Sequence, residues 1–165
     1  MLKSIKSLSC SLAAAFMLVL APAASQAATT IQVSLWDKGA DVEMPTGLGY
    51  AMPGADMSKA TMGIKLSQDS APHGVVGFKV KNDSKDTIHE MIVVKLAKPG
   101  TELPYIESEQ RVDEDKAGDK GEVSELEPGQ SGSLTLNLEP GDYLLYCNVA
   151  GHYVAGMWTE FTVTP

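Results

Sequence analysis

The chain has 165 residues, of which 44% are hydrophobic and 21% charged, and its formal net charge is −8. The length suits one domain of ordinary globular composition. Its acidic balance excludes nucleic acid as a partner, because phosphate binding needs a basic surface, and its two cysteines exclude a disulfide-rich scaffold or a four-cysteine zinc site.

The first 27 residues read as a secretory signal peptide. Lys3 and Lys6 precede an apolar stretch over residues 12–23, which is shorter than the ~20 residues that span a bilayer. Small residues follow, and residues 25–27 (Ser-Gln-Ala) form a small-x-small cleavage signal. We therefore expect residues 28–165 to form the mature domain, exported to the periplasm and without a membrane span.

Cleavage there removes Cys10 and leaves Cys147 as the single cysteine. It also removes two lysines and no acid, so the mature chain is more acidic still. A lone cysteine is unusual in an oxidising compartment, because exported proteins generally pair theirs. A free thiol there escapes oxidation when it is buried or bound to a metal.

The mature chain is predicted to be β-sheet almost throughout. Short runs with alternating or continuous apolar residues are separated by turns rich in Pro and Gly. The expected strands cover residues 30–36, 62–66, 75–81, 91–96, 133–138, 142–147 and 157–163. Seven to eight short strands predict an all-β, antiparallel Greek-key β-sandwich, with loop insertions at 38–61 and 101–130.

One stretch carries a metal-ligand pattern, Cys147-x4-His152-x4-Met157, between the last two predicted strands. His89, at the head of the strand over 89–96, supplies a second imidazole. Two His and one Cys in a plane, with a weak axial Met, are the ligands of a blue-copper electron-transfer site. Zinc is the rival metal, since it accepts Cys and His, but thioether is a poor zinc ligand.

With these residues, the sequence resembles the cupredoxins, the small type 1 copper proteins that include plastocyanins and azurins. The resemblance covers nearly the whole of residues 28–165. It implies that His89, Cys147, His152 and Met157 bind one copper ion that cycles between Cu(I) and Cu(II). The sequence around the ligands is similar to that of bacterial periplasmic cupredoxins associated with copper handling.

One position departs from the best-known cupredoxins. Their first His is commonly followed by Asn, which ties the two ligand loops together, whereas here Glu90 follows His89. We expect Asn148 to donate a hydrogen bond to Glu90, which as a carboxylate would favour Cu(II) and lower the reduction potential. The alternative is that Glu90 points to solvent.

The resemblance also implies an exit route for electrons. In the family the loop His exposes its ring edge within an apolar patch, which here would be His152 within residues 149–155. The remaining histidine, His73, is expected on a surface loop. The methionines Met44, Met52, Met57 and Met62 are expected to fill loops and core gaps, with a soft Cu(I) docking face as the alternative.

These features predict an electron carrier and not an enzyme, because a second, catalytic copper needs several more histidines and only His73 remains. Its expected partners are redox proteins such as a c-type cytochrome or a copper enzyme, met transiently, and the protein is expected to be a monomer. The alternative function is a periplasmic copper-tolerance protein that buffers or sequesters copper. A β-sandwich with an adhesive role and no metal is the third possibility, and the complete ligand set disfavours it.

Overall fold

The computed structural model describes residues 28–165, so the predicted signal peptide and Cys10 lie outside the described residues. The described chain forms eleven strands and two single-turn helices. In chain order these are β1 Thr29–Asp37, η1 Met57–Lys59, β2 Met62–Leu66, β3 Ser70–Pro72, β4 Gly74–Asn82, β5 His89–Lys95, β6 Tyr105–Ile106, β7 Arg111–Val112, α1 Glu114–Ala117, β8 Asp119–Leu126, β9 Ser131–Leu138, β10 Gly141–Tyr146 and β11 Trp158–Thr164.

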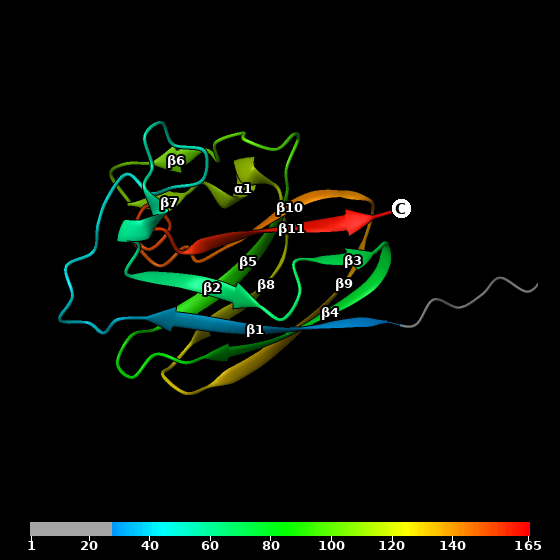
Figure 1. The fold of residues 1–165 in the computed structure, drawn as a ribbon, viewed down its shortest axis with the longest axis horizontal. Helices are drawn as coiled ribbons and strands as arrows, with labels where there is room; N and C mark the ends of the chain where they lie inside the picture. The colour runs from blue at the N-terminus through cyan, green and yellow to red at the C-terminus, as the bar shows by residue number, and fades with distance from the viewer. Residues whose placement is uncertain (1–27) are drawn as a thin grey trace, which may run out of the picture.

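The strands form a sandwich of two sheets (Figure 1). One sheet has the order β2-β1-β4-β9 and the other β3-β11-β10-β5-β8, while β6 and β7 form a separate pair. Neighbours are antiparallel except for β1 with β4 and β11 with β3, which run parallel. The predicted all-β sandwich is confirmed, although the sheets are mixed and the strands outnumber the seven to eight expected.

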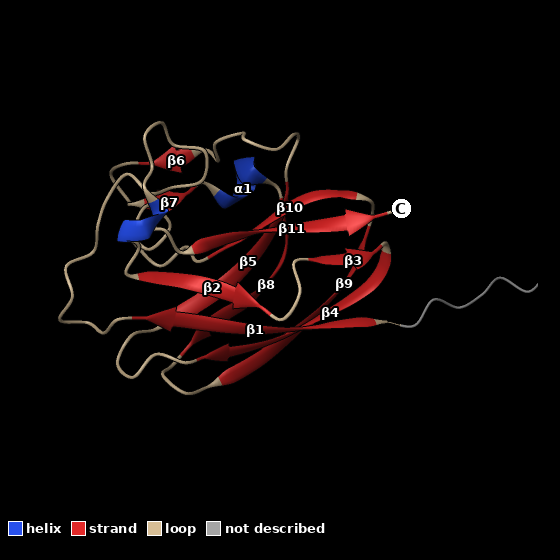
Figure 2. Cartoon of the chain, in the orientation of Figure 1, coloured by secondary structure: helices blue, strands red, loops and turns tan. Residues whose placement is uncertain are grey.

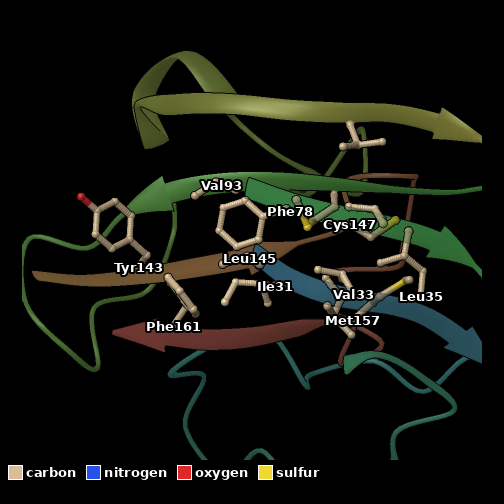
Figure 3. Close-up of a cluster of buried hydrophobic side chains, with 14 of the residues drawn as sticks. Ile31, Val33, Leu35, Phe78, Val93, Tyr143, Leu145, Cys147, Met157 and Phe161 are labelled. Atoms are coloured by element: carbon tan, nitrogen blue, oxygen red, sulfur yellow. The ribbon is translucent and has the colours of Figure 1, made fainter. Parts of the chain in front are cut away.

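The core lies between the sheets because the inner strands alternate apolar and polar residues. On β1 the residues Ile31, Val33 and Leu35 point inward and are at most 3% exposed. Phe78 of β4 meets Phe161 of β11 edge to face, with ring centroids 5.5 Å apart. Figure 3 shows this row of side chains between the two sheets. Each large apolar side chain buried in this way stabilises the fold by about 1.5–3 kcal/mol.

The five-stranded sheet is covered on its outer face as well. β5 is buried along nearly its whole length, which explains its continuous apolar sequence. A second apolar cluster, including Ile92, Leu144 and Tyr146, packs there beneath the segments that precede and include β6, β7 and α1. These segments gather with η1 at one end of the sandwich, away from the C-terminus (Figures 1 and 2). The prediction of an insertion at 38–61 is confirmed.

The prediction of a loop over residues 101–130 is wrong for its second half, where β8 pairs with β5. β8 is an edge strand in which Val123 and Leu126 alone are buried, so its sequence lacks a clear apolar alternation. Gly121, at a φ of 145°, accompanies an irregularity in the pairing. Charged side chains on such an edge strand discourage pairing with other molecules.

Within residues 28–165, no helix has the length and apolar character needed to cross a membrane.

Candidate metal centre

The predicted ligands come from the ends of three neighbouring strands. β5 begins at His89, β10 ends at Tyr146 directly before Cys147, and β11 begins directly after Met157. β10 lies between β5 and β11, and Tyr146 is paired with Ile92 on one side and Trp158 on the other. Hydrogen bonding in the sheet therefore places all these strand ends at one edge of the sandwich.

The loop between Cys147 and Met157 is closed by its own backbone. The Cys147 amide donates to the Met157 carbonyl at 3.0 Å, and the Met157 amide donates to the His152 carbonyl at 3.0 Å. Two glycines permit its tight turns, Gly151 at a φ of 83° and Gly156 at 98°. These hydrogen bonds and turns fix the backbone that carries Cys147, His152 and Met157.

The side chains of His89, Cys147 and His152 converge. The Nδ1 atoms of His89 and His152 lie 3.3 Å apart, and Cys147 Sγ lies 3.4 Å from His152 Nδ1. The three ligand atoms all lie within 4.8 Å of one another, and all three residues are buried. This is the one group of its kind among residues 28–165, and His73 is exposed elsewhere, as predicted.

Met157 is fully buried beside this group, in the same core cluster as Cys147. Figure 3 shows both sulfur-containing side chains at one end of the core, with Tyr143 and Phe161 toward the other end. The structure therefore brings all four predicted residues to one place. That each of them binds the metal stays a prediction.

Burial keeps these groups neutral in the metal-free protein. It lowers the pKa of His152 to about 4, with further lowering from the neighbouring His89. It also lowers the pKa of His89, although Asp37 opposes this effect. Burial raises the pKa of the Cys147 thiol to about 12, although a hydrogen bond from the Glu90 amide lowers this pKa in part. The imidazoles are thus ready to bind a cation, and the thiol releases a proton when a metal binds.

The predicted contact between Asn148 and Glu90 is present. The Asn148 backbone amide donates to Glu90 Oε1 at 3.0 Å, and Glu90 is 6% exposed, so the alternative in which Glu90 points to solvent is wrong. Burial raises the pKa of Glu90 to about 7, although the hydrogen bond from the Asn148 amide lowers this pKa in part. The Asn148 side chain instead bonds the backbone of Val112 and the carboxylate of Glu114.

Asp37, the last residue of β1, was not predicted from the sequence. Its Oδ2 lies 2.7 Å from His89 Nε2, the ring nitrogen that faces away from Cys147. Burial pushes the pKa of Asp37 up, but hydrogen bonds from Ser84, His89 and the Gly39 amide hold it below its usual value. Nothing local marks Asp37 as functional, because the partner is 52 residues away in the other sheet.

The predicted apolar patch around His152 is wrong in most of its residues. His152 is 4% exposed, and Tyr153, Val154 and Ala155 are buried. The insertion over 38–61 covers them, with the Leu48 amide donating to the Val154 carbonyl at 2.8 Å. Tyr105 adds to this cover, with its ring centroid 6.0 Å from that of Tyr153.

A cavity of about 390 Å³ remains beside this covered loop. Gly151 and Val154 of the ligand loop line it, together with Met44, Met52 and Tyr105. Met44 and Met57 are 43% and 38% exposed, whereas Met62 is buried in the core. Met62 therefore fills the core, as predicted, and Met44 lies in an exposed part of the first insertion. The Cu(I) docking face stays a prediction.

Comparison with known proteins supports the fold and identifies a family. A family model described as the sulfocyanin (SoxE) domain matches residues 68–165, more than half of the chain. The curated relative auracyanin-B of Chloroflexus aurantiacus is 51% identical over 41 residues, which is 24% of this chain and 17% of that protein. The match thus spans about a sixth of that relative's length.

Solved structures show the same fold. Auracyanin of Roseiflexus castenholzii superposes with a TM-score of 0.52 and 21% identity, covering 85% of this chain and 100% of that one. Rusticyanin of Thiobacillus ferrooxidans superposes with a TM-score of 0.51 and 14% identity, covering 84% of this chain and 79% of that one.

The donor set fits copper. Thiolate and thioether are soft ligands that suit Cu(I), and imidazole binds both oxidation states. His89, Cys147, His152 and Met157 are arranged as a type 1 copper site on a cupredoxin sandwich, which defines a blue copper protein. The chain belongs to the sulfocyanin (SoxE) domain family. The resemblance noted in the sequence is therefore confirmed.

Proposed function

We propose that this protein is an exported carrier that moves single electrons between redox partners by means of one copper ion. The observation that carries the proposal is the convergence of His89 Nδ1, His152 Nδ1 and Cys147 Sγ in a buried site beside Met157. Cupredoxin homologues are electron carriers rather than enzymes, and we extend that role to this chain.

The protein's part in electron transfer is to keep the ligands still. When bound, the copper supplies a one-electron couple. The closed loop over 147–157 and the sheet edge hold the ligand side chains, and burial of all four excludes water. Little rearrangement is then needed between the two oxidation states, which favours rapid transfer.

The visible spectrum of the copper-loaded protein is the direct test of the site. We expect an intense thiolate-to-copper band that is lost in Cys147→Ala and retained in His73→Ala, the matched control on the surface. A wild-type protein that binds no copper, or binds it without this band, contradicts the proposal.

Acidic side chains near the ligand loop support docking to a partner with a basic face. Asp41 and Glu43 precede Met44 in the first insertion, and Glu107 and Glu109 lie between β6 and β7; all four are exposed. Opposite charges accelerate association, and salt screens them. We expect the rate of electron exchange with a basic c-type cytochrome to fall as salt is raised, and a salt-independent rate contradicts this part of the proposal.

A second function, copper buffering or tolerance, is favoured by the methionines beside the ligand loop. Met44 and Met52 line the cavity next to Gly151 and offer soft thioethers that suit Cu(I). Rapid, reversible exchange with a c-type cytochrome supports the carrier. Copper-sensitive growth of a deletion strain without a respiratory defect supports copper handling instead.

Export to the periplasm is the remaining part of the proposal, supported by the charged, apolar and small-residue regions within residues 1–27. Cell fractionation with N-terminal sequencing tests it. We expect periplasmic protein that begins at or near residue 28, and full-length protein in the cytoplasm contradicts it.

A further inference from the structure

We propose that Asp37 is a positioning residue of the copper centre, which holds His89 with Nδ1 toward the metal and lowers the reduction potential. This inference rests on the proposed copper function. The carboxylate of Asp37 is not one of the four predicted ligands. The inference starts from the 2.7 Å contact between Asp37 Oδ2 and His89 Nε2.

The contact joins the two sheets of the sandwich. Asp37 ends β1 in the four-stranded sheet, and His89 begins β5 in the five-stranded sheet. The side chain of His89 is fully buried and that of Asp37 is 5% exposed, so water does not compete for the hydrogen bond. The imidazole is therefore oriented from across the core rather than by its own strand alone.

The carboxylate is itself held in place. Asp37 Oδ1 accepts a hydrogen bond from the Gly39 amide at 2.7 Å, and the Ser84 side chain also bonds the carboxyl group. The Lys38 amide donates to the Thr61 carbonyl at 2.9 Å, which anchors the chain just past Asp37. A fixed carboxylate can fix the ring that it contacts.

The position of the acceptor decides which nitrogen of His89 carries the proton. A carboxylate at 2.7 Å requires Nε2–H, which leaves the lone pair on Nδ1. Nδ1 is the atom that lies 3.3 Å from His152 Nδ1, within the ligand group. Asp37 thus selects the form of the ring that is competent to bind a metal.

The same hydrogen bond acts on the metal through the ring. A carboxylate behind an imidazole raises the basicity of the ligand, and removal of such partners typically costs about 10–100-fold in metal affinity. A more basic, partly anionic ligand favours the more highly charged ion, so the effect falls mainly on Cu(II). The contact therefore favours the oxidised state of the centre.

The test compares Asp37→Asn and Asp37→Ala with wild type. Asn keeps an acceptor oxygen without the charge, and Ala removes the acceptor. Asp86→Asn is the matched control. The exposed carboxylate of Asp86 accepts a hydrogen bond from the amide of Ala40, three residues after Asp37, and not from His89. This substitution removes one negative charge from the same end of the molecule.

The first measurement is the tautomer of His89 in the metal-free protein, by nitrogen NMR. We expect Nε2–H alone in wild type and Asp86→Asn, and a detectable population of Nδ1–H in Asp37→Ala. A predominantly Nδ1–H ring in wild type, or an unchanged tautomer in a folded Asp37→Ala protein, overturns the positioning role. This readout does not depend on copper.

The second measurement is the reduction potential of the copper-loaded proteins. If Asp37→Asn weakens Cu(II) binding about tenfold and leaves Cu(I) unchanged, the potential rises by about 60 mV. A potential equal to that of Asp86→Asn overturns the tuning role. Absence of the thiolate-to-copper band in wild type instead overturns the proposed function and leaves the tautomer result to judge Asp37.

Discussion

The side chain of Asn148 links the ligand loop to the β7 segment by hydrogen bonds. Removal of this side chain is expected to destabilise the protein strongly. Asn148 Oδ1 accepts from the Val112 amide at 2.6 Å, and Asn148 Nδ2 donates to the Val112 carbonyl at 2.9 Å and to Glu114 Oε1 at 2.7 Å. Asn148 and Val112 are 2% and 3% exposed. The substitution to test is Asn148→Ala, which keeps the backbone contact to Glu90.

The magnitude follows from the two backbone groups of Val112 that lose a buried partner. A buried donor or acceptor left without a hydrogen bond costs about 1–3 kcal/mol, so the loss of two partners in Asn148→Ala is expected to lower the free energy of unfolding by about 2–6 kcal/mol. Domains of this kind have about 5–15 kcal/mol in all. The change is therefore a large fraction of the total stability.

Urea unfolding of the metal-free protein, followed by tryptophan fluorescence, measures the effect without linkage to copper. With a slope of about 2 kcal/mol per molar, the midpoint is expected to fall by about 1–3 M. The control is Asn137→Ala on the exposed face of β9, which is expected to change stability by less than about 0.5 kcal/mol. If the two variants lose the same free energy of unfolding, the stabilising role of the Asn148 side chain is refuted.

Three further predictions follow from the same structure. Glu90→Gln is expected to raise the reduction potential of the copper-loaded protein at pH 8. Because burial raises the pKa of Glu90 from 4.5 to about 7, the metal-free wild type is expected to lose about 3 kcal/mol of stability as the pH rises through that range. Glu90→Gln removes that loss, and parallel pH profiles of the two proteins contradict it. Gly156→Ala, where a Cβ would lie 3.0 Å from the Cβ of Ala60 at a φ of 98°, is expected to cost more stability than Gly129→Ala. Gly129 has a φ of 78° with nothing within 4 Å, so Gly129→Ala measures the backbone strain alone, about 1–2 kcal/mol; equal losses in urea unfolding contradict the crowding. Copper at about 1,000 times its dissociation constant is expected to add about 4 kcal/mol to the unfolding free energy. Cys147→Ala abolishes this gain, and a Cys147→Ala protein stabilised as much as wild type contradicts the assignment of the thiolate.

The fold class and the candidate ligands follow from local patterns in the amino-acid sequence. Alternation of apolar residues on strands such as β1 and β4 is a local property that any half-buried strand must have. The spacing of Cys147, His152 and Met157 is also local, since a short loop between adjacent strands brings the three together. His89 was singled out because it heads a predicted strand, and the resemblance to cupredoxins then matched it to the first His ligand of that family.

The surroundings of those ligands depend on contacts between residues that are far apart in the chain. Asp37 meets His89 across the two sheets, and no local pattern encodes a contact between residues so far apart in the chain. The cover over Tyr153 and Val154 comes from an insertion with little regular structure, so these apolar residues of the ligand loop pack against protein instead of facing solvent. The edge strand β8 was not predicted because its sequence lacks a clear apolar alternation. It is a strand because it pairs with β5. The ligand types are a property of the sequence, whereas their orientation, burial and access depend on long-range packing.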